Sequence, residues 1–287
     1  MKRSDSPALP AYVRDSIAPS VRAALAEDVA DGDITAGLIP ADRQARATLI
    51  TREPCVLCGR PWAEEVFRQL GGHVSLDWQA DDGDALAADQ VICELEGNAR
   101  ELLTGERNAM NFLQTLSGVA TLARDYADAV AGKQITILDT RKTLPGLRAA
   151  QKYAVLTGGC HNHRIGLFDA FLIKENHISA CGGISAAITR ARELAPGKPL
   201  IVEVETLEEL DEAIAAGPDQ IMLDNFDDAS RQAAYERAPA HIALELSGNI
   251  SLDMLRAMPA QPRPVLVSSG ALTKHVQAVD LSLRVMA

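Results

Sequence analysis

The chain has 287 residues, of which 47% are hydrophobic and 23% charged, so it can bury a large core in one big domain or two ordinary ones. It carries 28 Lys and Arg against 39 Asp and Glu, a formal net charge of −11. This acidic balance argues against nucleic acid or an anionic membrane surface as the main partner. Because no 18 apolar residues run together and the first residues contain no apolar signal segment, we expect a cytoplasmic protein without a membrane span.

The first part of the chain predicts a separate α+β domain. Three segments have the β-branched, alternating pattern of strands, at 45–53, 73–80 and 90–97, and a helical pattern covers 61–70. Gly and Asp turns lie between them. A long helical pattern over 101–130 would connect this domain to the rest of the chain.

Five cysteines occur, an odd number at wide spacing, which argues against a disulfide framework. Only Cys55 and Cys58 have the spacing of metal ligands. A zinc site would need two further ligands at matching spacing, and the sequence offers no second pair. Buried strand thiols are therefore the favoured interpretation.

From about residue 134 onward, short apolar runs alternate with helical patterns, which is typical of βα units. One helical pattern covers 184–195, and another covers 206–217 with Thr206 as its N-cap. Six such units predict a parallel α/β barrel. An open doubly wound sheet is the alternative, although no Gly-rich dinucleotide motif follows the first strand. The expected strands are 134–139, 170–175, 200–205, 220–224, 241–247 and 264–269.

In a parallel barrel, chemistry gathers at the carboxyl ends of the strands. The side chains expected there are polar and strongly charged. In chain order they are Asp139, Thr140, Arg141 and Lys142; Lys174, Glu175, Asn176 and His177; Glu203 and Glu205; Asp224 and Asn225; Ser247, Gly248 and Asn249; and Ser268, Ser269 and Gly270.

Three of these residues, Lys174, Glu203 and Glu205, would be unfavourable in a hydrophobic core. Lys174 directly follows an apolar run, where a charge is costly unless it is paired or binds a ligand. A purely structural pairing with Glu203 or Asp224 is the alternative. Glu203 and Glu205 share one face of their strand by the period of two, which favours a metal or a polar lumen over a salt-bridged layer.

The segment 139–177 differs in charge from the rest of the chain. It holds six Lys and Arg and three Asp and Glu, a net charge of +3, whereas the remaining residues carry −14. A local positive site within an acidic protein predicts a small, strongly anionic ligand rather than a polymer.

The last two strand ends, at 247–249 and 268–270, are Ser- and Gly-containing turns that lead into helices. Backbone N–H groups in such turns can bind a phosphate, and barrels often place a phosphate site after their final strands. Ordinary βα turns use the same residues, but two in tandem support the phosphate interpretation. The site would suit a phosphorylated sugar that faces a second anionic substrate.

These motifs resemble the quinolinate phosphoribosyltransferase family, also called carboxylating nicotinate-nucleotide pyrophosphorylases. The resemblance covers nearly the whole chain in order. It is carried by the segments 27–35, 105–121, 139–155, 158–178, 202–210, 221–226, 246–250 and 270–282.

The resemblance implies an N-terminal α/β sandwich domain over 1–117, on which residues 278–287 would pack, and an incomplete α/β barrel over 118–277. It implies a homodimer, with a hexamer also open, in which Arg107 reaches the neighbouring active site. It also implies a Mg²⁺ cofactor near Glu203 and Asp224, held largely through water and substrate.

The resemblance assigns site roles as well. It implies catalytic roles for Lys142, Lys174, Glu203 and Asp224. The residues that would bind substrate are Arg107, Thr140, Arg141, His163, Arg164, Ser247, Gly248, Asn249, Ser269, Gly270 and Ala271. The implied reaction joins quinolinate to phosphoribosyl pyrophosphate and gives nicotinate mononucleotide, CO₂ and pyrophosphate in de novo NAD biosynthesis. Several cationic donors suit quinolinate because it carries two adjacent carboxylates.

The sequence departs from the family pattern at Ser269, where a small apolar residue is expected, and in the Pro-rich stretch 259–265. Two alternatives stand beside the quinolinate enzyme. One is a related phosphoribosyltransferase-like protein of molybdenum operons, and the intact Lys174–Glu175 pair argues against it. The other is a catalytically idle barrel, which would have no reason to keep unpaired charges at its mouth.

Overall fold

The computed structural model describes residues 9–248 and 250–286. These residues form two compact units. The first combines the residues up to Asp125 with Thr143–Gly159 and with the residues from Leu272 onward, and the second combines Tyr126–Lys142 with Cys160–Ala271. Among the described residues, no helix has the length and apolar character needed to cross a membrane.

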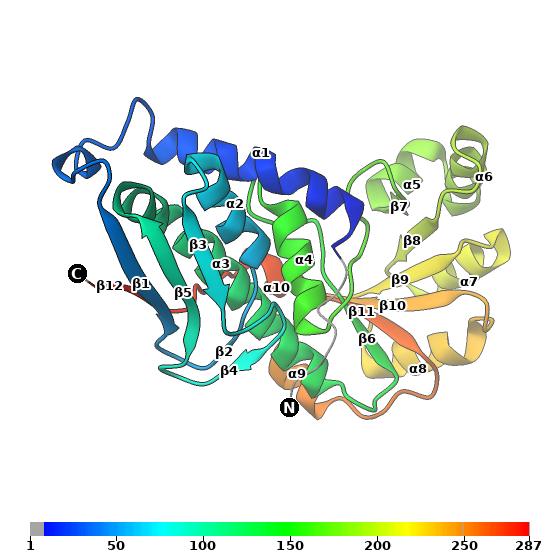
Figure 1. Ribbon diagram of the computed structural model, residues 1–287. Helices are drawn as coiled ribbons and strands as arrows, with labels where there is room; N and C mark the ends of the chain where they lie inside the picture. Colours follow the sequence, from blue (N-terminus) through cyan, green and yellow to red (C-terminus); the bar gives the residue numbers. More distant parts are fainter. Residues whose placement is uncertain (1–8, 249, 287) are drawn as a thin grey trace. The chain divides into compact units, whose positions relative to one another are not determined.

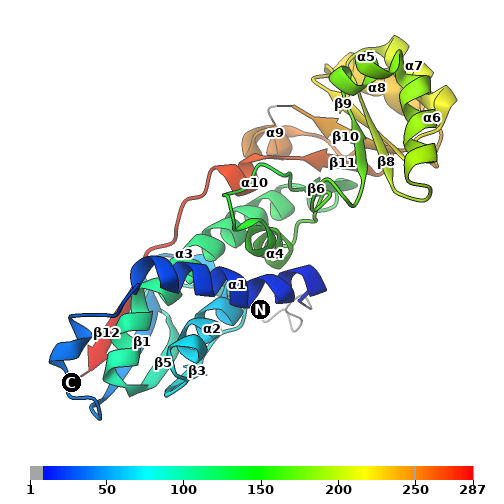
Figure 2. The ribbon, with the colours of Figure 1, turned by 90° about the horizontal axis from the view of Figure 1, so that it is seen from above.

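The first unit is built on a four-stranded antiparallel sheet in the order β12-β1-β5-β3 (Figure 1). The last strand of the chain pairs with the first, so a red strand lies beside a blue one in Figure 2. Ala47 pairs with Leu95 on one side and with Val285 on the other. The strands are β1 (Gln44–Thr51), β3 (Val74–Trp78), β5 (Val91–Asn98) and β12 (Leu281–Met286).

Helices cover this sheet, and the aromatic core lies among them. The Trp62 ring stands 5.8 Å from that of Tyr153, and both side chains are buried. The buried Asp82 carboxylate accepts hydrogen bonds from the amides of Gly59 and Arg60 and from the Tyr153 hydroxyl, so it caps one helix and ties another to it. The elements are α1 (Ala11–Asp28), η1 (Ala36–Leu38), β2 (Cys55–Val56), α2 (Arg60–Leu70), β4 (Ala85–Leu86), α3 (Ala99–Ala129) and α4 (Arg148–Gly158).

The sequence analysis did not predict α4, which directly follows the Arg141–Lys142 segment. The helix is buried on nearly every side, and Gln151, Lys152 and Thr157 are buried with it. Because these polar side chains are buried, the match between apolar residues and the buried face, on which the helical patterns at 61–70, 101–130, 184–195 and 206–217 depended, does not hold here.

The second unit contains six parallel strands in the order β6-β11-β10-β9-β8-β7 (Figure 1). The first strand therefore lies beside the last, as in a barrel. Among the described residues β6 and β7 do not pair, and a single bridge joins Leu138 to His161 instead. The prediction of an incomplete parallel barrel is confirmed. The strands are β6 (Ile135–Leu138), β7 (Phe171–Ile173), β8 (Leu200–Val204), β9 (Gln220–Asp224), β10 (Ala243–Ser247) and β11 (Val265–Ser268).

Helices follow the strands of this unit, and α6, α7 and α8 pack one beside the next. Thr206 caps α7 as predicted, because its hydroxyl accepts from the Glu209 amide at 3.2 Å. Strand β7 is shorter than predicted, since Lys174 is already the N-cap of α5. The helices are α5 (Glu175–Cys181), α6 (Ile184–Leu194), α7 (Leu207–Ala216), α8 (Asp228–Arg237), α9 (Leu252–Ala257) and α10 (Ala271–Lys274).

Candidate active site

Thr140 and Lys142, just beyond the end of β6, lie against the turn between β11 and α10. The Lys142 amide donates to the Thr140 hydroxyl at 3.1 Å. A Cβ atom added to Gly270 would lie 3.0 Å from Lys142 Cδ and 3.5 Å from Thr140 Oγ1. Glycine at position 270 therefore allows this turn to approach Lys142 and Thr140, and the structure brings these three expected site residues together.

Arg141 and Arg164 form a cationic pair. Arg141 Nε is buried and has no hydrogen-bond partner among the described residues. Burial lowers the pKa of Arg164, and the Arg141 charge lowers it further, while the Asp169 charge acts in the opposite direction. Two guanidinium groups that repel each other in a partly buried place form a ready binding site for an anion.

Two buried carboxylates hold the segment that carries His163. Asp139, at the end of β6, accepts from the His163 amide at 2.9 Å and from Asn162 Nδ2 at 2.7 Å. Glu245, on β10, accepts from the Gln220 side chain and lies 3.2 Å from His163 Nε2. Both carboxylates have 0% relative exposure.

The sequence analysis missed Glu245 as a site residue, although a signal was present. Leu244 and Leu246 flank it in β10, and both are buried. The alternation of a strand puts Glu245 on the opposite face from these two leucines, which is the same argument that singled out Glu203.

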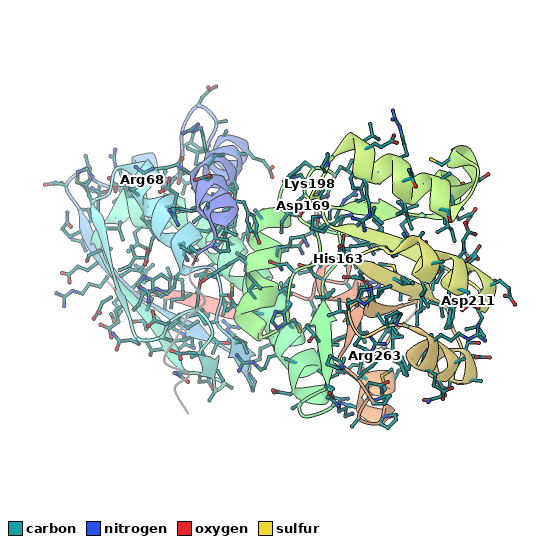
Figure 3. The ribbon with its side chains drawn as sticks, turned by 90° about the vertical axis from the view of Figure 1, so that its right-hand side faces the viewer. Arg68, His163, Asp169, Lys198, Asp211 and Arg263 are labelled. Carbon is teal, nitrogen blue, oxygen red and sulfur yellow. The ribbon has the colours of Figure 1, made fainter. Side chains whose placement is uncertain are left out.

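A cavity of about 430 Å³ lies inside the barrel unit beside these groups. His163, Arg164 and Asn162 form its polar part, and Leu138 and Ile201 contribute to its apolar part. Figure 3 labels His163 and Asp169, which come from the irregular segment between β6 and β7. Among the described lining residues Arg164 is the cation and Asp169 the carboxylate, and the apolar residues beside Arg164 suit the flat ring of an anionic molecule.

Lys174 and Glu203 form an ion pair across the ends of β7 and β8. The pairing that the sequence left open as a structural alternative therefore exists. The Lys174 side chain is still 45% exposed and that of Glu203 only 13%. A partly exposed cation of this kind can turn from its carboxylate to an anionic ligand.

Asp224 ends β9, the neighbour of β8, and is half-buried with its carboxylate accepting from Asn225 Nδ2 at 3.0 Å. The described residues contain no group of three or more His, Cys, Asp or Glu side chains placed to hold a metal. Glu203 and Asp224 would therefore supply only two protein ligands to a divalent cation. Mg²⁺ tolerates such a site, because it keeps several water molecules and is commonly bound through one or two carboxylates together with substrate phosphates.

The turn after β10 packs against the end of β9. Ser247 pairs with Asp224 in the parallel register, and the Asn225 amide donates to the Ser247 carbonyl at 3.2 Å. Gly248 has φ +135°, and a Cβ atom there would lie 2.9 Å from Asn225 Oδ1, so only glycine fits. Asn249 lies outside the described residues.

Ser269, the departure from the family pattern, has its hydroxyl engaged within its own turn. Its amide donates to the Leu138 carbonyl at 2.9 Å, and its hydroxyl accepts from the Ala271 amide at 3.4 Å. The residue is 3% exposed. The extra hydroxyl is therefore satisfied inside the turn.

Arg107 belongs to the first unit, unlike the other proposed site residues that the structure describes. It is exposed on α3 and lines a groove of about 420 Å³, together with Asn111 and Glu27. Asn108, in the same groove, donates to Asp28 at 2.8 Å. An exposed arginine in a preformed groove is available to an anion that arrives from outside the unit.

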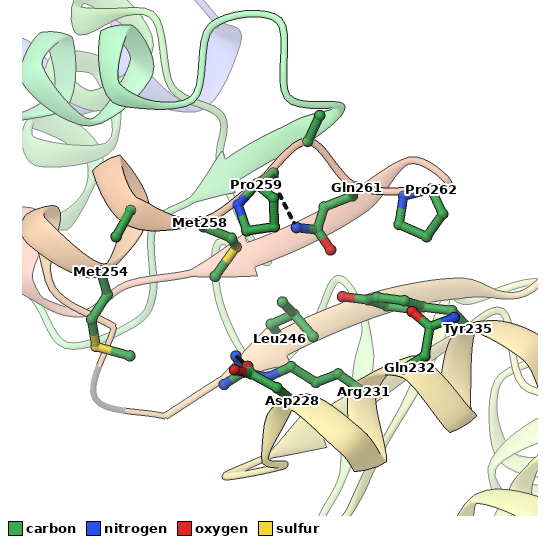
Figure 4. Close-up of a pocket in the computed structure, with 12 residues that line it drawn as sticks. Asp228, Arg231, Gln232, Tyr235, Leu246, Met254, Met258, Pro259, Gln261 and Pro262 are labelled. Carbon is green, nitrogen blue, oxygen red and sulfur yellow. Dashed lines mark hydrogen bonds and ion pairs between the residues drawn. The ribbon is translucent and has the colours of Figure 1, made fainter.

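A further pocket, of about 510 Å³, lies between α8 and the segment that follows α9 (Figure 4). Leu246, Met254 and Met258 line it, and Gln261 donates to the Pro259 carbonyl at 2.8 Å at its edge. None of the proposed site residues that the structure describes lines this pocket.

The fold and the site define an α/β-barrel enzyme for small anionic substrates, with cations on the early strands and Ser–Gly turns on the late ones. Two family models match the chain. Residues 33–117 match the N-terminal domain of quinolinate phosphoribosyl transferase, and residues 119–284 match its C-terminal domain. The chain belongs to the quinolinate phosphoribosyltransferase family.

Relatives support this over nearly the full length. The chain is 42% identical over 260 residues to a probable carboxylating nicotinate-nucleotide pyrophosphorylase of Bacillus subtilis, which covers 90% of each chain. It is 41% identical over 279 residues to the enzyme of that name from Mycobacterium leprae, with 94% of this chain and 97% of the relative covered. The solved structure of the nicotinate-nucleotide pyrophosphorylase from Francisella tularensis superposes with a TM-score of 0.90 at 47% identity, over 95% of this chain and 96% of the other.

Proposed function

We propose that this protein is a carboxylating nicotinate-nucleotide pyrophosphorylase. It transfers the phosphoribosyl group of phosphoribosyl pyrophosphate to quinolinate and yields nicotinate mononucleotide, CO₂ and pyrophosphate for de novo NAD synthesis. The names of the relatives and the family match support this activity. Among the structural observations, the Arg141–Arg164 pair supports the proposal most directly, because two neighbouring cations, one of them with a buried Nε that has no partner among the described residues, suit a dicarboxylate substrate.

Quinolinate binding follows from the chemistry of its two adjacent carboxylates. A guanidinium fork binds a carboxylate with two parallel hydrogen bonds, and Arg141 and Arg164 together can bind both groups. Lys174 supplies a third cation when it turns from Glu203. A bound dianion would also relieve the repulsion that lowers the pKa of Arg164.

The reaction has two steps. The ring nitrogen of quinolinate donates its lone pair to C1 of the ribose, and the C1–O bond breaks with its electrons leaving on pyrophosphate. The nitrogen is then a pyridinium, so it stabilises the electron pair that the 2-carboxylate leaves at C2 when CO₂ departs. That carbon finally takes up a proton. Alignment of the two reactants and charge stabilisation are the protein's contributions.

The phosphoribosyl donor is assigned to the later strands. Lys142, close to Gly270, would bind at the junction of the two substrates. The turns at Ser247–Gly248 and Ser269–Ala271 would bind phosphate through backbone N–H groups. The Ser269 amide is not one of them, because it donates to the Leu138 carbonyl, and the Ala271 amide would exchange its 3.4 Å bond to the Ser269 hydroxyl for the phosphate. Since α9 and α10 have only six and four residues, we assign this binding to the amides rather than to a helix dipole.

Mg²⁺ is the proposed cofactor, with Glu203 and Asp224 as its protein contacts. When bound, the ion neutralises charge on the departing pyrophosphate. Both residues lie at strand ends beside Lys174 and Ser247, so the phosphoribosyl group and the leaving group would share this part of the site.

We also propose a homodimer in which Arg107 completes the active site of the neighbouring copy. The exposure of Arg107 in a groove of its own unit supports this arrangement, because the residue is free to contact a molecule bound elsewhere.

The direct test mixes the purified protein with quinolinate, phosphoribosyl pyrophosphate and Mg²⁺, and follows nicotinate mononucleotide and CO₂ by chromatography and gas release. We expect both products in equal amounts. Nicotinate and nicotinamide serve as alternative bases, and turnover with one of them but not with quinolinate would refute the assignment.

A further inference from the structure

Glu245 is an unusual residue to find inside this barrel. Its side chain is fully buried on β10, where an ionised carboxylate is costly unless hydrogen bonds satisfy it. One oxygen, Oε2, accepts from the Gln220 side chain and from His163 Nε2. The other, Oε1, has no partner among the described residues. A buried carboxyl group with one unpartnered oxygen is unfavourable in a hydrophobic core, which points to a role beyond packing.

The hydrogen-bond network assigns the tautomer of His163. The Arg164 amide donates to His163 Nδ1 at 2.8 Å, so Nδ1 must present a lone pair. The ring proton then lies on Nε2, which donates to Glu245 at 3.2 Å. The other tautomer would place one N–H against another at Nδ1, and would leave a lone pair facing a carboxylate at Nε2. Glu245 therefore selects one of the two forms.

The tautomer of His163 also affects the orientation of Arg164. The His163 main chain is held by Asp139 on β6, and its ring is held by Glu245 on β10, with β11 between these two strands in the sheet. The ring in turn accepts the Arg164 amide, so the peptide that carries the guanidinium is fixed in direction. The Arg164 side chain continues to Ala170, whose carbonyl accepts from Nη1 at 3.1 Å.

We propose that Glu245 is a positioning residue for quinolinate binding. It holds His163 in the Nε2–H tautomer, which orients Arg164 beside Arg141. The inference rests on the proposed function, because it names the substrate that the cationic pair serves. Gln220 is the second donor to the same oxygen and keeps the carboxylate facing the ring.

The kinetic test compares Glu245→Gln with Glu245→Leu. Gln offers one oxygen to both donors, so its KM for quinolinate stays close to that of the wild type. Leu leaves Nε2–H unpartnered, and we expect the KM for quinolinate to rise about tenfold while the KM for phosphoribosyl pyrophosphate changes little. Glu245→Met is the substitute if the Leu variant does not fold. An unchanged KM for quinolinate in a folded apolar variant would overturn the proposal.

The same substitution made in a His163→Asn variant distinguishes a positioning role of Glu245 from simple packing. In His163→Asn, the side-chain oxygen can take the place of Nδ1 and accept the Arg164 amide without help from residue 245. Glu245→Leu should therefore add little to the KM of His163→Asn. A tenfold rise that is the same with His and with Asn at position 163 would show that Glu245 acts by another route.

The tautomer can also be measured without any substrate. In protein labelled with ¹⁵N-histidine, the nitrogen that carries the proton resonates well upfield of the one that does not, and loss of a signal in His163→Asn assigns the ring. We expect the proton on Nε2 in the wild type and in Glu245→Gln, and a shift toward Nδ1–H in Glu245→Leu. A wild-type ring protonated on Nδ1 would refute the inference, even if the protein proves to act on another base.

Discussion

At the scale of single residues, Arg141 is expected to bind substrate and, at the same time, to lower the stability of the folded protein. Its Nε is buried without a partner, and its charge lowers the pKa of Arg164. Arg141→Ala removes about 2–3 kcal/mol of charge-assisted hydrogen bonding, so kcat/KM for quinolinate should fall about 100-fold. The melting temperature should hold or rise, because the repulsion with Arg164 is gone.

Steady-state kinetics and thermal unfolding of the same preparation check this prediction. Arg190→Ala is the matched control, since Arg190 is exposed and its ion pair among the described residues is with Glu193 on its own helix. A lower melting temperature with unchanged kinetics would show that Arg141 is a structural residue instead.

The buried thiol of Cys93 makes stability depend on alkaline pH. Burial raises its pKa to about 12, whereas a thiol in the unfolded chain ionises near about 8.5. The unfolded state therefore loses this proton first, so the contribution of Cys93 to stability is present below about pH 8.5 and is lost as the pH rises toward 12. The difference in the free energy of unfolding between wild type and Cys93→Ala should shrink between pH 8 and pH 10.

Urea unfolding at several pH values measures that difference. Cys181→Ala is the control, because Cys181 is exposed, and its effect should not vary in this way. A constant difference for Cys93→Ala across the range would contradict the prediction.

At the scale of elements, the cap of α9 connects a helix to the phosphate turn. Ser251 accepts from the Met254 amide at 3.2 Å, and α9 has only six residues, so it depends on this cap. Ser251→Ala should cost about 1 kcal/mol and loosen the adjoining Ser247–Gly248 turn. We expect the KM for phosphoribosyl pyrophosphate to rise several-fold.

Thr206→Ala provides the comparison, because Thr206 caps α7, which does not follow a proposed phosphate turn. It should destabilise the protein to a similar degree and leave that KM unchanged. Equal effects of the two substitutions on KM would mean that α9 has no special connection with substrate.

The elements also show which structural features could be predicted from the sequence, and why the others could not. Strand β9 was predicted at its observed ends, since polar residues follow an apolar run abruptly at Asp224. Helix α4 was missed because polar residues, Gln151 and Lys152 among them, are buried in it, so its polar positions do not mark a solvent face. The Lys174–Glu203 contact could be anticipated from strand order in a parallel sheet, but the hydrogen bonds of Glu245 join β9, β10 and an irregular segment that no periodicity describes.

At the scale of the whole molecule, the proposed sharing of Arg107 predicts complementation. Arg107→Ala and Arg141→Ala should each be nearly inactive alone. In a mixed dimer one site would contain both substitutions and the other neither, so random mixing should restore about a quarter of wild-type activity. Subunits are mixed by mild denaturation and refolding, and the assay follows nicotinate mononucleotide.

A pair of variants that both affect one subunit's own residues, Arg141→Ala with Arg164→Ala, should give no recovery in the same procedure. The absence of recovery with Arg107→Ala would place that arginine in its own subunit's site or outside the active site altogether.

The pairing of β12 with β1 affects when the first unit can complete its fold during synthesis. The ribosome releases β1 early, but its partner, Leu281–Met286, comes last among the described residues. Until then β1 has a bare edge, which can pair with another chain. The first unit therefore cannot complete its sheet until β12 has been synthesised, so a chain stalled or truncated before Leu281 would be a source of aggregation.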